Sequence, residues 1–588
     1  MAEKKRITAY SFLDEYRGTL FNGEWPTLPE LFKISTKRFG ERNCFTDFLP
    51  QRRTLTYNAA LETILTLAQF LRSRGVGKGD RVAVSGKNST EWVCVYLATN
   101  FCGATIVPID YALRDDEIQN LLKTAEPKLF FVDEERFETF SASLKIEVFS
   151  LSTKFSEKYV FSLKADKEYE LESPVEEDVA AILFTSGTTG NPKGVMLTHK
   201  NFVSCCFIAQ ANLKLYCTDV FYALLPIHHS YTMQAVFIES LSVGAETVFG
   251  KTMAVTKMMK ELREGKITMF LGVPLLFNKL LDGIMKGVRK KGPIVYGIIR
   301  ALMGLSYAIK KLTGKNPGRV FFGSILKKAN LSNIRIMISG GGPLAPAVFK
   351  QYNQLGVDFV QGYGLTETAP ILTLNPKENF KIDSVGRFDR NDMTIKILDP
   401  DEKGVGEIVV KGPMVMKGYY NMPEETAAVF TEDGFFKTGD LGRIDSEDYV
   451  YICGRAKNMI VTEGGKNVYP EEIENEFQTY FDEIDQITVV GYSEGGEGGE
   501  KIEAKIYPTD SLFEKFKIKR DDDFQAPQVL AKIQELVASV NQRLQPYARI
   551  SKLTILKKPL EMTSTKKVKR NTINKNEDET EEKAKGKE

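Results

Sequence analysis

Helical and strand-like hydrophobic patterns alternate along the first 380 residues. Between residues 55 and 132, the stretch TYNAALETILTLAQFLRSRG has apolar residues at helical spacing and leads into the apolar run DRVAVSG; the same order of helix and strand then repeats. The rhythm returns after residue 178, in VAAILF, in a helix that begins after Thr198, and in FYALLP, KITMFLGV and NIRIMISGG. Strands that alternate with helices favour parallel sheets covered by helices on both faces. The sequence therefore predicts a large α/β body.

The pattern of apolar residues and glycines changes after about residue 383. Short alternating stretches broken by glycine, such as TIKILDPDEKG and GEIVVKGP, predict a β-rich subdomain over residues 383–456 that completes an N-terminal domain of residues 1–456. Residues 457–570 read as a small α+β C-terminal domain. The last eighteen residues, 571–588, contain one large aliphatic and no aromatic side chain, so we expect a disordered tail.

Composition narrows the class of protein. The chain has 588 residues, 43% of them hydrophobic, enough for the cores of two or more domains. Its 79 basic and 77 acidic residues give a net charge of +2, which does not favour nucleic acid as a partner. The seven scattered cysteines lack a CxxC pair, as expected for reduced thiols in the cytoplasm. We find neither a signal peptide nor a run of about 18 apolar residues that could span a membrane.

A glycine- and hydroxyl-rich stretch, LFTSGTTGNPKG, occupies residues 183–194. Its glycines allow close backbone approach to a ligand, and its hydroxyls and lysine suit a polyphosphate. The Walker pattern is excluded because it needs glycine where Pro192 stands. Composition alone would also fit a flexible linker. In length and order the stretch resembles the signature of the adenylate-forming superfamily, which includes acyl-CoA synthetases. The resemblance implies that ATP is held by Thr185, Ser186, Gly187, Thr188, Thr189 and Lys193.

Two further motifs of that superfamily follow in the expected order. SGGGPL at residues 339–344 resembles the segment that flanks adenine, through Gly341, Gly342 and Pro343. QGYGLTET at residues 361–368 resembles the segment that supplies an aromatic ring for adenine, a threonine for phosphate and a glutamate for Mg²⁺. The resemblance assigns these roles to Tyr363, Thr366 and Glu367, and it implies that Gly364 also contacts the nucleotide and that Thr185 is a second Mg²⁺ ligand.

The ribose and the hinge are matched downstream. Asp440, in GFFKTGDLG, can accept hydrogen bonds from two vicinal hydroxyls, and Arg455 matches the superfamily arginine that contacts the ribose. Lys457 stands where the superfamily has the hinge of a mobile C-terminal domain. Gly465 resembles the glycine that faces the pantetheine tunnel of coenzyme A after that domain rotates; the alternative is a plain turn before the helix YPEEIENEF.

The predicted catalytic lysine lies near the end of the chain. MTSTKKVKR at residues 562–570 resembles the lysine motif in the form typical of long-chain fatty acyl-CoA synthetases, which places the catalytic group at Lys567. A shift of one residue would place it at Lys566. Out of context, this basic run would instead predict a solvated surface.

A histidine pair lies in LPIHHSYTM. Counting from Pro226, the superfamily histidine beside the acyl carboxylate falls on His229, although Thr232 stands where glycine is common. The adjacent histidines do not predict a metal site, since no third ligand is evident in the sequence.

Residues 286–328 contain eleven basic and no acidic side chains. Apolar residues recur among them at helical spacing, at Ile294, Ile298, Leu302, Leu305, Ile309 and Leu312, until Gly314 and Pro317 interrupt the helix. This pattern resembles a basic amphipathic segment that rests on anionic lipid, at the inner face of the membrane. The alternative is a helix packed on its own domain with a solvated basic side.

Together the motifs predict an ATP-dependent acyl-CoA synthetase. A fatty acid, expected to be long-chain, would react with ATP and Mg²⁺ to give acyl-AMP and pyrophosphate, and coenzyme A would then take the acyl group and release AMP. The alternative acceptor is the thiol of a carrier protein. The absence of a carrier domain after Lys567 disfavours this alternative and leaves only transfer in trans. A non-catalytic binding protein is disfavoured, because the motif residues Glu367, Asp440 and Lys567 are all present.

Overall fold

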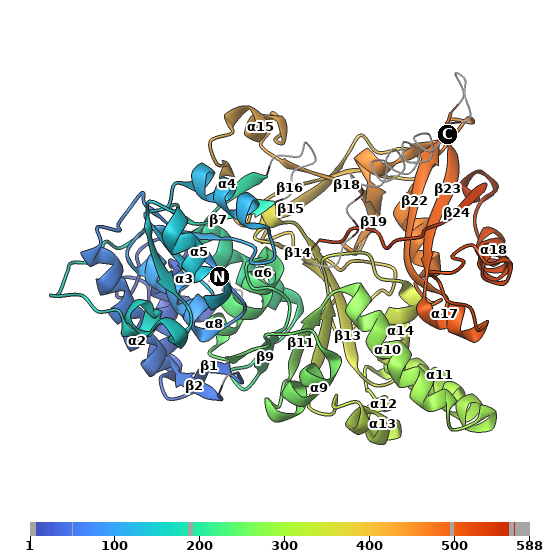
Figure 1. Cartoon of the computed structure of the whole chain (residues 1–588), viewed down its shortest axis with the longest axis horizontal. Helices are drawn as coiled ribbons and strands as arrows, with labels where there is room; N and C mark the ends of the chain where they lie inside the picture. The colour runs from blue at the N-terminus through green and yellow to red at the C-terminus, as the bar shows by residue number, and fades with distance from the viewer. Residues whose placement is uncertain are drawn as a thin grey trace, which may run out of the picture.

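The computed structural model describes residues 8–49, 51–185, 192–493, 499–563, 568 and 570. The predicted site residues Ser186, Gly187, Thr188, Thr189 and Lys567, together with the predicted tail 571–588, lie outside the described residues. The described chain forms two large sheets, a small antiparallel sheet, and a separate C-terminal group of strands and helices (Figure 1).

The first large sheet takes six of its seven strands from residues 81–198 and the seventh, β17, from much later in the chain. Its neighbours β3 to β7 are parallel, whereas β8 and β17 are added antiparallel at one edge. In spatial order the seven strands are β17 (Gly418–Tyr419), β8 (Lys193–Thr198), β7 (Val179–Thr185), β4 (Thr105–Pro108), β3 (Arg81–Ser85), β5 (Leu129–Val132) and β6 (Glu147–Ser150).

The second large sheet is parallel except at its two edges, where β14 and β2 run antiparallel to their neighbours. Inner strands such as β11 are buried at every position, as expected for a sheet with both faces covered. In spatial order the eight strands are β14 (Ile371–Leu374), β13 (Asp358–Gly364), β12 (Ile336–Ser339), β11 (Met269–Gly272), β9 (Val220–Ala223), β10 (Glu246–Phe249), β1 (Asn43–Asp47) and β2 (Arg53–Thr56).

Two helices lie between the large sheets. All residues of α3 (Thr90–Phe101) are buried, and α3 contacts strands of both sheets, as does α6 (His199–Asn212). The predicted start of α6 is confirmed, because the Thr198 side chain accepts a hydrogen bond from the Asn201 N–H. The other helices of this body are α1 (Leu28–Phe39), α2 (Tyr57–Ser73), α4 (Asp115–Ala125), α5 (Glu134–Ser143), α7 (Ser230–Thr232), α8 (Glu239–Val243), α9 (Val255–Glu264), α10 (Pro274–Arg289), α11 (Pro293–Thr313), α12 (Gly318–Phe321), α13 (Gly323–Lys328), α14 (Pro346–Gln354) and α15 (Pro423–Ala428).

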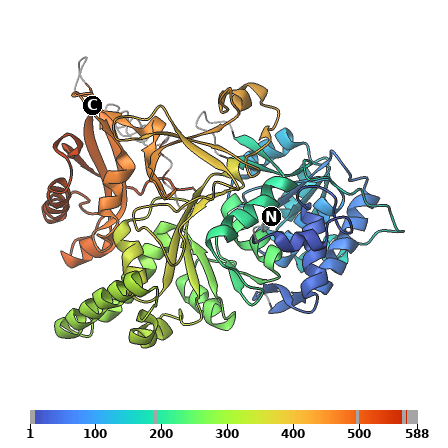
Figure 2. The same cartoon turned by 180° about the vertical axis from the view of Figure 1, so that it is seen from behind.

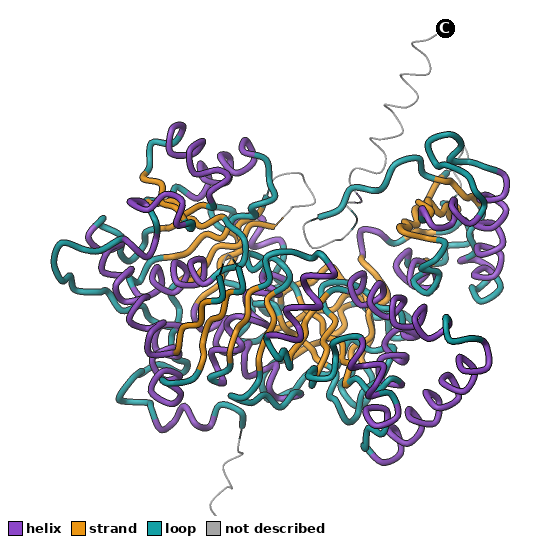
Figure 3. The backbone as a smooth tube through the Cα atoms, turned by 60° about the horizontal axis from the view of Figure 1, so that its bottom comes forward, coloured by secondary structure: helices purple, strands orange, loops and turns teal. Residues whose placement is uncertain are grey.

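The predicted β-rich stretch forms an antiparallel sheet of four strands, β15 (Thr394–Leu398), β16 (Gly406–Lys411), β18 (Phe436–Ile444) and β19 (Val450–Arg455). Beyond it, residues from Ile460 to Ile555 enclose their own hydrophobic core, and Figure 3 shows this part to one side of the sheets. Its elements are β20 (Ile460–Val461), β21 (Asn467–Val468), α16 (Pro470–Phe477), β22 (Ile484–Tyr492), β23 (Lys501–Pro508), α17 (Asp510–Lys515), α18 (Pro527–Asn541) and β24 (Lys552–Ile555).

The α/β class is confirmed, and one strand was missed. The sequence pattern led directly from the glycine-rich stretch to α6, whereas the structure inserts β8 between them. Gly194 in β8 interrupts the apolar pattern from which a strand would be predicted, because glycine has no side chain. Its lack of a side chain is required, since a Cβ there would lie 2.9 Å from Ile182 Cγ2.

Candidate active site

A cavity of about 2130 Å³ lies where the ends of the sheet strands meet the C-terminal part of the chain. Ligands of open α/β sheets bind at this edge. Of the predicted site residues that the structure describes, all but Gly465 line the cavity: Thr185, Lys193, His229, Gly341, Gly342, Pro343, Tyr363, Gly364, Thr366, Glu367, Asp440 and Arg455. Segments spread over 270 residues of sequence are thus brought to one place.

A buried carboxylate marks what we term the nucleotide end of the cavity. Asp440 on β18 is 4% exposed; its Oδ2 accepts a 2.7 Å hydrogen bond from Tyr363 Oη, and its Oδ1 lies 2.7 Å from Arg455 Nε. Arg455 stands directly opposite on β19. Burial, and then the charge of Asp440, raise the pKa of Tyr363 well above its usual range. The carboxylate is therefore held in place by its neighbours, with lone pairs remaining for vicinal hydroxyls.

Backbone contacts explain two of the predicted glycines. A Cβ at Gly364, where β13 turns into β14, would lie 1.5 Å from the Pro370 carbonyl oxygen, so only glycine fits. Gly341 adopts a positive φ of 76°, which glycine tolerates without strain. The loops after β12 and β13 can therefore turn tightly at the cavity wall.

Oxygen donors and a cation lie next to each other beside the nucleotide end. Thr185 ends β7 and pairs with Lys193, which begins β8. Lys193 Nζ lies 4.8 Å from the centre of the Tyr419 ring, and Tyr419 Oη donates a 3.0 Å hydrogen bond to Glu367 Oε1. A carboxylate and a hydroxyl on one cavity wall are donors that Mg²⁺ accepts while keeping several waters. Glu367 and Thr185 thus fit the ion that the sequence predicts, and the ammonium of Lys193 suits phosphate.

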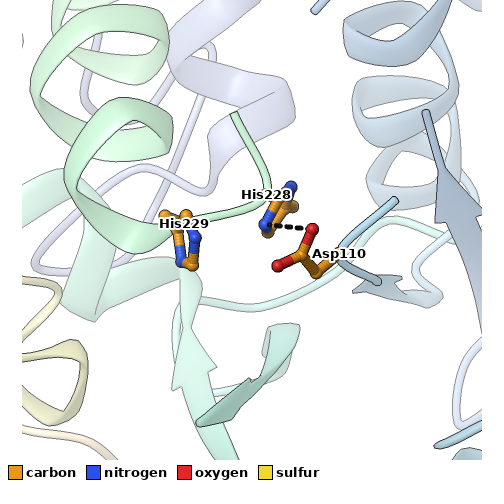
Figure 4. Close-up of side chains that lie close together, drawn as sticks. All are labelled: Asp110, His228 and His229. Carbon is orange, nitrogen blue, oxygen red and sulfur yellow. Dashed lines mark ion pairs between the residues drawn. The ribbon is translucent and has the colours of Figure 1, made fainter. Parts of the chain in front are cut away.

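Two histidines and an aspartate form a cluster that also lines the cavity (Figure 4). His228 is buried, and its Nε2 lies 3.4 Å from Asp110 Oδ1. One ligand atom from each of Asp110, His228 and His229 lies within 4.8 Å of the others, in a set of donors that metals accept. The expectation that no third group accompanies the histidines is therefore wrong. Asp110 lies two residues after the end of β4, but it precedes the histidines by more than a hundred residues, so no local spacing could reveal it.

Apolar side chains also line the cavity, among them Leu213, Leu215 and Ala235. Glu239, the first residue of α8, lines it as well, and we term these four residues the acid end. Glu239 is 2% exposed. Its Oε1 accepts a 2.9 Å hydrogen bond from Gln210 Nε2, whereas its Oε2 is without a hydrogen-bond partner in the described chain. Burial raises the pKa of Glu239 to about 8, against smaller opposing effects of Gln210 and Cys206. The sequence analysis missed this residue, because it lies within an apolar helical run.

Comparisons with known proteins agree with this arrangement. A sequence model of the family described as AMP-binding enzyme matches residues 32–420. The chain belongs to this family. A feruloyl-CoA synthase of Amycolatopsis is 28% identical over 464 residues, which cover 78% of this chain and 84% of that protein. A long-chain-fatty-acid–CoA ligase of Bacillus subtilis is 28% identical over 93% of this chain and 94% of its own.

Among solved structures, ATP-bound MatB from Rhodopseudomonas palustris superposes with a TM-score of 0.73. It is 25% identical and covers 94% of this chain and 99% of its own. As a member of the AMP-binding family, the chain is an ATP-dependent acyl-CoA ligase that forms an acyl adenylate.

The C-terminal residues of this AMP-binding protein also reach the cavity. Met562, Thr563, Val568 and Arg570, which flank the predicted Lys567, all line it. Arg570 is anchored by a 2.5 Å contact from Nη2 to Glu474 Oε1, and burial raises the pKa of Glu474 to about 7. This contact fixes Arg570 to α16, which carries Glu474.

Gly465 is the predicted residue that lies elsewhere. It forms the turn between β20 and β21, with a φ of 66° and a 2.8 Å hydrogen bond from its N–H to the Thr462 carbonyl. The turn explains the glycine without a ligand, and a role in coenzyme A binding requires the C-terminal part to move.

No helix of the described ranges is long and apolar enough to cross a membrane.

Proposed function

We propose that the chain activates a long-chain fatty acid with ATP and transfers the acyl group to coenzyme A, with release of AMP and pyrophosphate. The observation that supports this proposal is the cavity lining, which includes both the paired Asp440 and the apolar side chains of Leu213, Leu215 and Ala235. Similarity to a long-chain-fatty-acid–CoA ligase over nearly the whole chain also supports an aliphatic acid.

In the first half-reaction, an oxygen of the acid carboxylate attacks the α-phosphorus of ATP, and pyrophosphate leaves. Both reactants are anionic, so the protein must offset their repulsion with fixed positive groups. Lys193 beside Thr185 is suited to the leaving phosphates, and Asp440 with Arg455 would fix the ribose. When bound by Glu367 and Thr185, Mg²⁺ would supply charge neutralisation at the phosphates. We assign Lys567 to the bridge between carboxylate and α-phosphate.

In the second half-reaction, the thiol of coenzyme A attacks the acyl carbon, and AMP leaves with the bonding electrons. We propose that the C-terminal domain, residues 457–570, turns about Lys457 for this step. The turn would withdraw Lys567 and bring Gly465 to the pantetheine arm. Lys457 lines the cavity, and burial followed by repulsion from Arg455 lowers its pKa.

The decisive experiment separates the half-reactions. Lys567→Ala should abolish ATP–pyrophosphate exchange with a fatty acid, yet still convert supplied acyl-AMP and coenzyme A to the thioester. Lys566→Ala is the matched control and should keep both activities. Equal loss of both half-reactions in Lys567→Ala would contradict the assignment, and loss in Lys566→Ala alone would move the role by one residue.

The acid and the thiol acceptor are tested on the wild-type chain. Exchange with a panel of acids from acetate to palmitate should rise with chain length, and thioester should form with free coenzyme A. Thioester formation with a carrier protein but not with coenzyme A would replace the proposed acceptor.

A further inference from the structure

Helix α11 is held to the protein by one side only. Ile299, Met303 and Ser306 are buried against neighbouring helices that include α10 and α14. On the same side, Lys310 is 3% exposed, and its Nζ lies 2.7 Å from both Asp358 Oδ1 and Asn353 Oδ1. Breaking such a buried ion pair would be costly, so the orientation of α11 about its own axis is fixed.

The opposite side of α11 is apolar and exposed. Ile294 is 78% exposed, Ile298 56%, Leu305 52% and Leu312 85%; we call these four residues the α11 face. They belong to the apolar face predicted from the sequence, but the packed side of the helix is a different one. Val320 and Phe321 on α12 are exposed as well. Soluble surfaces seldom present such a contiguous apolar set, so this one indicates an interaction.

The position of α11 leaves the α11 face accessible. The helix lies along the outer edge of the molecule, beyond α10 and α14, in both views (Figures 1 and 2). No part of the described chain covers the α11 face.

The charge around the α11 face identifies the partner. Lys290, Lys291 and Lys315 are exposed at the two ends of α11, and residues 286–328 contain no acidic side chain. A second copy of this chain docking through the same face would bring these cations against their own kind, which disfavours a symmetric dimer. An anionic lipid surface offers both a hydrophobic phase and opposite charge, and long basic side chains can extend to its headgroups.

We propose that the α11 face docks on an anionic membrane surface, with the helix lying in the plane of the interface. The adjoining helix α10 leads from this surface to the cavity, which is lined by its residues Pro274, Asn278 and Asp282. A protein docked in this way has its acid-binding cavity on the same helix pair as its lipid contact. The proposal stands independently of which acid is used.

Co-sedimentation with vesicles tests the proposal. The full chain should bind vesicles of phosphatidylglycerol and phosphatidylcholine, and bind vesicles of phosphatidylcholine alone at least tenfold more weakly. The double variant Ile298→Glu, Leu305→Glu should lose at least tenfold in affinity for the anionic vesicles. The matched control is Val175→Glu, Val255→Glu, because both valines are exposed to a similar degree outside α11. It should bind as the wild type does.

Several results would overturn the proposal. These are equal binding to neutral and anionic vesicles, undiminished binding by the α11 variant, and a loss in the control as large as in the α11 variant. Sedimentation velocity without lipid tests the other occupant, since a dimer that the α11 variant dissociates would assign the face to a second copy. All four substituted positions are exposed, so unchanged thermal unfolding of both variants verifies that any loss comes from the surface.

Discussion

The nucleotide end and the acid end of the cavity lining each contain a buried carboxyl group, but the two groups differ in how many of their oxygens have a partner. Asp440 at the nucleotide end is 4% exposed and is contacted on both oxygens, by Tyr363 and Arg455. Glu239 at the acid end is 2% exposed, and only one of its two oxygens accepts a hydrogen bond. Polar groups that lose water without gaining a partner destabilise the folded chain.

This difference follows from what each end has to recognise. ATP is the same in every turnover, so a rigid carboxylate that is held on both oxygens can be prepared for its ribose in the proposed function. A pocket for the acid, in contrast, has to select among acids. A buried polar atom without a hydrogen-bond partner disfavours any acid that lacks a group to bond with it. We therefore expect substitutions at the two ends to have opposite consequences.

The largest expected effect is at the nucleotide end. Asp440→Ala removes the acceptor for two ribose hydroxyls and leaves Arg455 without its partner. Each hydrogen bond to a charged group contributes roughly 1.5–3 kcal/mol, so kcat/KM for ATP in pyrophosphate exchange should fall about 100-fold or more. The control is Asp448→Ala, which removes an ion pair with Arg390 at the protein surface. A small loss in Asp440→Ala would mean that the paired carboxylate is structural.

The second effect concerns stability at the acid end. Glu239 titrates near pH 8 in the folded chain, against an ordinary value of 4.5. Between these values the folded state binds more protons than the unfolded state, so the free energy of unfolding falls as pH rises, by at most about 1.4 kcal/mol per pH unit.

Glu239→Gln keeps the shape of the side chain and cannot ionise. It should remove this decline, so that its stability relative to wild type grows from pH 5 to pH 8 and then levels off. Urea unfolding at pH 5, 7 and 9 measures the difference. Glu264→Gln, at an exposed position on α9, is the control. Identical pH slopes for Glu239→Gln and wild type would show that the carboxyl is hydrated.

Much of the fold could be predicted from the sequence, because most of its strands and helices can be recognised from a short stretch of residues. Fully buried runs such as β11 and capped helices such as α6 follow from short-range pattern and capping chemistry. The missed strand β8 contains Gly194, which is selected by a close contact with Ile182 across the sheet. The side of α11 that packs on the protein could not be predicted either. A lysine is normally exposed, and Lys310 is buried on this side only because it pairs with Asp358, which is distant in sequence.

The candidate site divides in the same way. Tyr363, Glu367 and Asp440 lie in motifs whose order could be read along the chain, and the structure gathers them at one cavity while their roles stay predictions. Asp110 and Glu239 could not be found in that way. Asp110 follows β4 of one large sheet and the histidines follow β9 of the other, so they become neighbours only when the two sheets pack together. Glu239 is notable only because it is buried without a full set of partners.

The third effect is on selectivity at the acid end. Glu239 lies ten residues beyond His229 along the helical segment, about 15 Å at roughly 1.5 Å per residue. We expect a hydroxyl on the acid chain at that depth to satisfy Oε2, so wild type should prefer the hydroxylated acid to the plain acid of equal length. Glu239→Leu should reverse this preference about tenfold in the ratio of kcat/KM, equivalent to about 1.4 kcal/mol. An unchanged ratio would remove Glu239 from the acid pocket.

The smallest effect tests whether the two ends are coupled by the C-terminal part, whose residues also line the cavity. Asp482, before β22, lies 2.6 Å from Lys286 Nζ and 3.5 Å from Arg289 Nη1, both on α10. These half-exposed pairs hold the C-terminal part against α10, and each contributes about 0.5 kcal/mol. Asp482→Asn should therefore weaken the present arrangement and shift the ratio of thioester formation to adenylation about twofold toward thioester.

Salt distinguishes this coupling from a local defect. The effect of Asp482→Asn should vanish near 1 M salt, where screening already weakens the pairs in wild type. Glu476→Gln is the matched control, because it breaks an equally exposed pair with Arg543 that lies wholly within the C-terminal part. If both variants shift the ratio alike, the C-terminal part responds to its own charge and not to its contact with α10. If only Asp482→Asn does so, the helix that borders the acid cavity also sets how long the nucleotide end stays closed.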